Sequence, residues 1–122
     1  MARYKLVILA LTLFLCGSIY SQSEQKKPEA FKFAEFQSIK SDALCEKVSD
    51  FYSALRKNES TQGFIINYGS ATDIRKRRDG IVKCINFRDY DTPRVTFVDG
   101  PVEPKVRTVF WLVPNGADDP TP

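Results

Sequence analysis

Four consecutive basic residues, Arg-Lys-Arg-Arg at positions 75–78, are the most concentrated chemical feature of this sequence. They lie near the start of a predicted helix, and at 100° per residue Arg77 and Arg78 flank its apolar stripe. Guanidinium groups beside the free N–H groups of a helix N-terminus can bind an anion. Arg77 and Arg78 are therefore candidate ligand-binding residues. The alternative is a solvated helix end whose long side chains cover apolar surface.

The composition excludes most catalytic and metal chemistry. The 122 residues include no histidine and three cysteines, which rules out Ser-His-Asp or Cys-His catalysis and histidine-ligated or all-cysteine zinc sites. Asp89, Asp91 and Asp99 stand at predicted turns, where aspartate bonds to its own backbone. We therefore expect a protein that is not an enzyme and that has no cofactor and no metal.

The N-terminal segment predicts export. A basic start is followed by an apolar run of eleven residues, 6–16, which is too short to span a membrane and is typical of a signal peptide ending at Ser21. The alternative is a lipoprotein signal with acylation at Cys16. We expect a periplasmic or extracellular protein with no transmembrane segment after signal removal.

The charge of the exported chain argues against nucleic acid as a partner. The signal contains two of the 18 basic residues and none of the 15 acidic ones, so the net charge falls from +3 to +1. Such a balance gives no general attraction to a polyanion.

Removal of the signal leaves two cysteines, Cys45 and Cys84, in an oxidising compartment. Each lies beside the apolar stripe of a predicted helix, and two helices side by side on a sheet bring one such flank of each together. The sequence therefore predicts a Cys45–Cys84 disulfide. Two buried free thiols remain the alternative.

The hydropathy pattern predicts strands and helices in the order β-α-β-α-β-β. The strands are expected at 31–36, 63–69, 94–99 and 106–113. The first helix is expected between an N-cap at Ser41 and a stop at Asn58, and the second at 73–87. This order predicts an α/β (α+β) two-layer sandwich, with a four-stranded mixed sheet and two helices on one face. Residues 106–113 are apolar on both faces, which suits a central strand, and the short 100–105 connection is compatible with a hairpin. A protein partner could cover the helix-free face.

Several short motifs recur in order along this region. They are GFIINYG (63–69), the residues Asn86, Arg88, Asp91 and Arg94, the turn Val98-Asp99-Gly100, and FWLVP (110–114). Together with the element order they resemble the OmpA-like peptidoglycan-associating domain, and more closely a group of small secreted bacterial proteins of that fold. The resemblance implies an OmpA-like domain at 31–114. The signal peptide at 1–21 precedes it, and composition predicts a flexible leader at 22–30 and a disordered Pro-rich tail at 115–122.

The resemblance also implies a ligand. OmpA-like domains hold the diaminopimelate of peptidoglycan with an aspartate and an arginine, which match its ammonium and its carboxylate. The arginine corresponds to Arg77 or Arg78, and Asp73 is the local substitute for the aspartate. The expected function is that of a small secreted cell-envelope binding module for peptidoglycan or another anionic wall component. The alternative is a structural or protein–protein interaction role without peptidoglycan binding.

Overall fold

Four strands and two α-helices follow one another in the predicted order in the computed structural model, which describes residues 26–122. The elements are β1 (Phe31–Phe36), α1 (Ser41–Arg56), β2 (Gln62–Tyr68), α2 (Ala71–Phe87), a 3-10 turn (Thr92–Arg94), β3 (Val95–Asp99) and β4 (Arg107–Val113). The predicted signal peptide and Cys16 lie outside the described residues.

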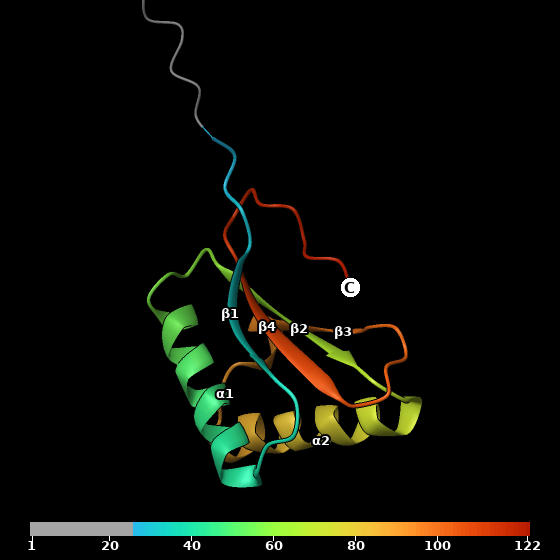
Figure 1. Ribbon diagram of the computed structural model, residues 1–122. Helices are drawn as coiled ribbons and strands as arrows, with labels where there is room; N and C mark the ends of the chain where they lie inside the picture. The colour runs from blue at the N-terminus through green and yellow to red at the C-terminus, as the bar shows by residue number, and fades with distance from the viewer. Residues whose placement is uncertain (1–25) are drawn as a thin grey trace, which may run out of the picture.

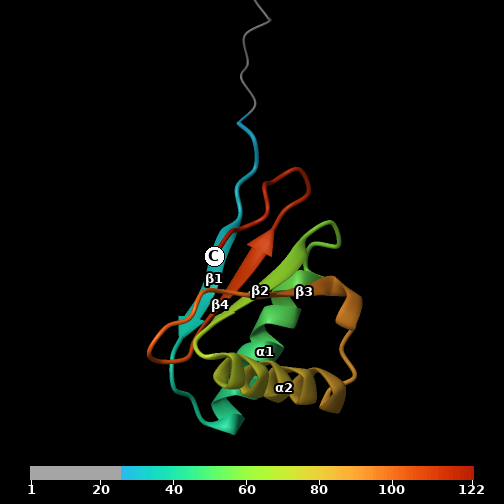
Figure 2. The same ribbon diagram turned by 90° about the vertical axis from the view of Figure 1, so that its right-hand side faces the viewer.

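The four strands form one mixed sheet in the order β1-β4-β2-β3 (Figures 1 and 2). β4 pairs antiparallel with both β1 and β2, and β3 pairs parallel with β2. The prediction of β4 as a central strand is confirmed. β3 and β4 do not form the hairpin that their short connection would permit, because β2 lies between these strands. A short connection permits a hairpin, but here the parallel pairing of β3 with β2 leaves the other edge of β2 to β4.

The main core lies between the helices and one face of the sheet, as the predicted two-layer sandwich requires (Figure 1). Its members come from α1, α2 and the facing strand positions: Leu44, Val48, Phe51, Tyr52, Leu55, Ile65, Ile81, Cys84, Ile85, Val95 and Phe110. Phe51 is fully buried and stacks at a tilt on Phe110, with ring centroids 4.8 Å apart. Gly63 makes room for that ring, since a Cβ atom there would lie 2.8 Å from Phe51 Cζ.

The two helix starts differ from the sequence prediction in a way that hydrogen bonding explains. α1 begins at Ser41 itself, and Lys40 occupies the cap position without a side-chain hydrogen bond. α2 begins at Ala71, two residues earlier than expected, because the Ser70 hydroxyl accepts a hydrogen bond from the Asp73 amide at 3.1 Å. This N-cap satisfies one of the free donors of the first turn.

The predicted disulfide between Cys45 and Cys84 is confirmed, with a Cα–Cα distance of 5.2 Å. It joins α1 to α2 on the helix side of the sheet, and Cys84 is only 3% exposed. Within residues 26–122, no helix has both the length and the apolar character needed to cross a membrane.

The helix-free face of the sheet is partly covered by the chain itself. Ile66, Tyr68 and Val109 form a small second core there, with Val98 and Trp111 beside them. The C-terminal segment, residues 114–122, turns back from the end of β4 and passes in front of this face (Figures 1 and 2). An ion pair between Lys27 and Asp118, at 2.7 Å, joins it to the N-terminal side of β1.

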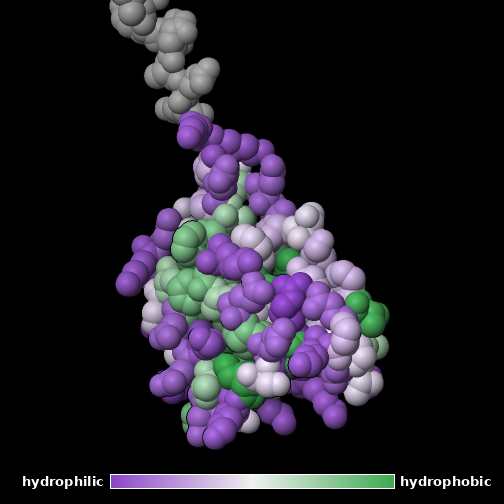
Figure 3. Space-filling model, viewed as in Figure 1, coloured by the Kyte–Doolittle hydropathy of each residue, from purple (hydrophilic) through white to green (hydrophobic). Residues whose placement is uncertain are grey.

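Figure 3 shows a largely polar surface on which hydrophobic residues gather over β1. Phe31 of that strand is 61% exposed, and the outer edge of β1 has no neighbouring strand among the described residues.

Candidate functional site

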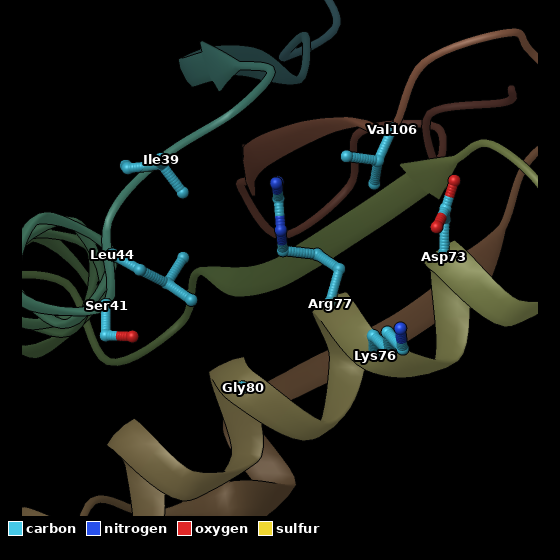
Figure 4. Close-up of a pocket in the computed structure, with 8 residues that line it drawn as sticks. All are labelled: Ile39, Ser41, Leu44, Asp73, Lys76, Arg77, Gly80 and Val106. Carbon is cyan, nitrogen blue, oxygen red and sulfur yellow. The ribbon is translucent and has the colours of Figure 1, made fainter.

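Arg77 lies in a cavity of about 290 Å³ between the start of α1, the first half of α2 and Val106 (Figure 4). Asp73, Lys76, Arg77 and Gly80 of α2 line it. Their spacing of three, four and seven residues puts them on one face of the helix. The structure therefore places two of the three predicted site residues, Asp73 and Arg77, in one cavity.

The guanidinium of Arg77 is held by neutral groups. Its Nη1 donates to the hydroxyl of Thr108 at 2.6 Å, and its Nη2 donates to the carbonyl oxygen of Gln37 at 2.6 Å. Its Cζ lies 5.2 Å from the centroid of the Phe36 ring. Arg77 thus connects α2 to β4 and to the end of β1, in one fixed orientation.

Thr108 extends this arrangement into the core. Its hydroxyl donates to Asn67 Oδ1 at 2.7 Å, and both Thr108 and Asn67 are 0% exposed. A buried polar pair needs partners to offset the loss of its hydration. Arg77 and Asn67 provide both partners of the Thr108 hydroxyl, which makes the position of the guanidinium a consequence of core packing.

The positive charge of Arg77 is incompletely compensated. Among the described residues no carboxylate lies within 4.0 Å of it. Burial lowers the pKa of Arg77 and the nearby Asp73 carboxylate opposes that shift, but an arginine stays protonated in proteins. The five N–H donors of a guanidinium exceed the two hydrogen bonds that Arg77 makes, so donors remain for a ligand.

Arg78, the third predicted site residue, has a different role. Its guanidinium pairs with Asp99 at the end of β3 and lies 5.9 Å from the centroid of the Phe97 ring. It does not line the cavity at Arg77. The two arginines that flank the apolar stripe on the helical wheel therefore have different partners, because they lie on opposite sides of that stripe.

Sequence reasoning missed Lys76, which lines the cavity beside Arg77 with an exposed side chain. The spacing Asp73, Lys76, Arg77, Gly80 was a usable signal, because these positions share one helix face. Thr108 and Gln37 were also missed, and no local pattern indicates them, since they are 31 and 40 residues from Arg77 in sequence.

The motif arginine Arg94 lies at a second cavity, of about 250 Å³, and has a structural role there. Its Nη2 donates to the carbonyl oxygens of Leu55, Asn58 and Thr61 at 2.6–3.1 Å and so satisfies the C-terminal end of α1. In the same place Tyr52 stacks on Tyr90 at 4.6 Å, and burial raises the pKa of Tyr52 to about 12. These contacts give Arg94, one of the residues of the motif described above, a structural role that requires no ligand.

No group of three or more His, Cys, Asp or Glu side chains within residues 26–122 is placed to hold a metal ion. In comparisons with known proteins, no family model matches the chain and no curated protein matches it.

Proposed function

We propose that this protein is a non-catalytic binding module of the cell envelope that takes an anionic wall component at the Arg77 cavity. The observation that supports this most is the guanidinium of Arg77, which is fixed by neutral partners and has no carboxylate within ion-pair distance among residues 26–122. A ligand carboxylate would supply that missing charge in a bidentate geometry.

The peptide stem of peptidoglycan is the proposed ligand. Asp73 lines the same cavity as Arg77 and Lys76, so an ammonium and a carboxylate of one ligand end would each meet an opposite charge. The motif resemblance to OmpA-like domains points to the same ligand. The predicted signal peptide and the disulfide between α1 and α2 agree with an exported protein in an oxidising compartment.

The alternative function, a protein partner on the helix-free face, has less support. The chain's own residues 114–122 pass in front of that face. A partner would have to displace them or bind around them.

Retention on purified cell wall tests the proposal. Lys76→Glu reverses a charge at the cavity, and Lys76 makes no hydrogen bond or ion pair among the described residues. Arg75→Glu is the matched control, since it makes the same charge change on an exposed neighbour outside the cavity. We expect the wild type and Arg75→Glu to be retained on the wall to the same extent. The retained amount of Lys76→Glu should be at least tenfold lower. Equal loss in both variants indicates general charge attraction and contradicts the proposal, as does a wild type that is not retained.

A further inference from the structure

β1 is an edge strand of the sheet that residues 26–122 form, since β4 pairs with one of its two sides. The outer side of an edge strand presents backbone N–H and C=O groups that can pair with a further strand. Hydrophobic residues gather over β1 on the surface, and Phe31 is 61% exposed (Figure 3). β1 is therefore the part of the sheet at which another strand can be added.

A bulge at Phe33 gives β1 a symmetric arrangement of side chains. The register against β4 shifts between Lys32 and Ala34, so Phe33 is the extra residue of the bulge. Lys32 and Glu35 are opposite β4 residues of the helix-free face, and both charges therefore lie on that face. The other side chains of the strand belong to the helix side, either by packing on the main core or by pairing with a residue that does: Phe31, Phe33, Ala34 and Phe36.

The strand is also complementary to a second copy of itself that runs in the opposite direction. With a two-fold axis between Phe33 and Ala34, Lys32 of one copy lies opposite Glu35 of the other, and the reverse pair is identical. The aromatic residues at the two ends of the strand lie opposite each other. Opposing residues of an antiparallel pair must share a face, and the bulge meets this requirement for every pair.

Other registers of the same pairing bring like charges together. Opposing residues also share a face when Lys32 is opposite Lys32 of the other copy, or Glu35 opposite Glu35, and like charges directly opposite each other are destabilising. Lysine on an edge and a bulge are both features that disfavour pairing with an unrelated strand. The register that satisfies the faces and the charges together is thus a pairing with a second copy of this chain.

We propose that the protein forms a two-fold dimer by antiparallel pairing of β1 with β1 of a second copy. The two sheets then form one continuous sheet, and the helices of both copies lie on the same face, because the two-fold axis is perpendicular to the sheet. Lys32 and Glu35, which are 2.7 Å apart within one copy, become an alternating group of four charges across the junction. The dimer is independent of the ligand proposed for the Arg77 cavity.

Sedimentation velocity over a range of protein concentrations measures the association. We expect the wild type to dimerise reversibly. Lys32→Glu and Glu35→Lys should each weaken dimerisation at least about tenfold, because each places like charges opposite each other twice in one dimer. Both positions are exposed, so these variants should fold as the wild type does, which circular dichroism checks. Glu59→Lys, an exposed charge reversal between α1 and β2, is the control and should dimerise as the wild type.

Mixing the two β1 variants separates a contact between copies from one within a copy. Neither variant keeps the internal pair of opposite charges, but every charge on β1 of Lys32→Glu faces an opposite charge on β1 of Glu35→Lys. We expect a one-to-one mixed dimer, detected by native mass spectrometry with one variant 15N-labelled. Lys32→Glu mixed with Glu59→Lys has the same difference in net charge and should give far less mixed dimer.

Three results would overturn the dimer. They are a wild type that stays monomeric at every concentration, β1 variants that dimerise as well as the wild type, and a pair of β1 variants that gives no more mixed dimer than the Glu59→Lys control.

Discussion

Thr108 shows how one buried hydroxyl sets the position of the candidate ligand-binding arginine. It accepts a hydrogen bond from Arg77 and donates one to Asn67, and all three groups belong to different elements. A guanidinium positioned in this way does not have to be ordered when a ligand arrives, which reduces the entropic cost of binding.

Replacing Thr108 by valine should therefore destabilise the protein and weaken the site together. The variant keeps the shape of the side chain but leaves Asn67 Oδ1 and Arg77 Nη1 without their partner, and one unsatisfied buried group costs about 1–3 kcal/mol. We expect a loss of that size in the free energy of unfolding, measured with urea. Thr96→Val, at an exposed position of β3, is the control and should change stability little. An unchanged urea midpoint for Thr108→Val would show that the hydroxyl is dispensable.

Arg77 shows which properties of a site can be predicted from the sequence and which cannot. Its position on a helical wheel predicted that it leans toward the sheet, and this is confirmed by its bond to Thr108 of β4. The same wheel placed Arg78 on the opposite flank of the stripe, but it did not indicate its partner Asp99, which lies at the end of β3, the edge strand opposite β1. A helical wheel gives direction around one axis, but the partners depend on which strand lies beneath, and this information is not local.

At the scale of elements, the disulfide links two helices that also pack on each other and on the sheet. Cys45 and Cys84 close a loop of 39 residues that contains β2 and most of both helices. Closing such a loop in the unfolded chain contributes about 4 kcal/mol to stability in the chain-entropy model. This is a large share of the total for a small domain.

Cys45→Ala together with Cys84→Ala should therefore lower the free energy of unfolding by about 2–4 kcal/mol, as is usual for a native disulfide in a small domain. Thermal unfolding by circular dichroism measures the change. The wild type in reducing agent is the control and should move in the same direction. A double variant as stable as the oxidised wild type would mean that the helices hold together without the bridge.

The pairing of β1 with β4 includes a charged group of three that makes stability depend on pH. Arg107 contacts both Glu35 of β1 and Glu103 of the preceding loop. The hydrogen bond from Lys32 is the main cause of the lowered pKa of Glu35, and the bond from Arg107 is the main cause of the lowered pKa of Glu103. A carboxyl whose folded-state pKa is lowered adds stability above its ordinary value of 4.5, and this stability is lost as the pH falls through the folded pKa.

We expect the urea midpoint to fall as the pH is lowered below about 4.5, where these carboxylates begin to take up protons. Arg107→Gln should reduce this fall, because it removes contacts that favour both ionised carboxylates. Lys105→Gln removes an exposed charge close by and is the control. The same pH dependence in Arg107→Gln and in the wild type would exclude a contribution from this group.

The elements, the two-layer arrangement and the central position of β4 were predictable, whereas the neighbours of each strand were not. Both helices and all four strands follow from hydropathy periods, which are local and repeat over several residues. The short connection between β3 and β4 is compatible with a hairpin, but these strands are not neighbours. Loop length limits which strands can be neighbours but does not decide between them. That choice depends on burial. β4 has buried side chains on both faces, such as Val109 and Phe110, and a strand of this kind is placed between two others, here β1 and β2.

At the scale of the whole molecule, the C-terminal segment acts as a partial cover for the helix-free face. Trp111 lies on that face and is the single tryptophan of the chain. Its fluorescence therefore reports on the cover. Removal of residues 115–122 should shift the emission to longer wavelengths and increase binding of an apolar dye, because more of the second core meets water.

Asp118→Asn provides the milder test of the cover. It removes the ion pair with Lys27 but keeps the length of the segment. Exposed ion pairs contribute about 1 kcal/mol or less, so only a small shift in emission is expected. Truncation without any change in the emission would mean that the segment does not shield the tryptophan.

The position of β4 in the middle of the sheet has a consequence for the order in which the protein can be built. Of the strands within residues 26–122, β1 is made first, yet its only neighbour is β4, which is made last. Contacts between such distant segments form late and slow the search for the native state. A chain interrupted before Arg107 has β2 and β3 to pair in parallel but nothing to join β1 to them. The first of the described strands therefore gains its neighbour only after the last has been made, so the four-stranded sheet cannot be complete in a nascent chain that lacks β4.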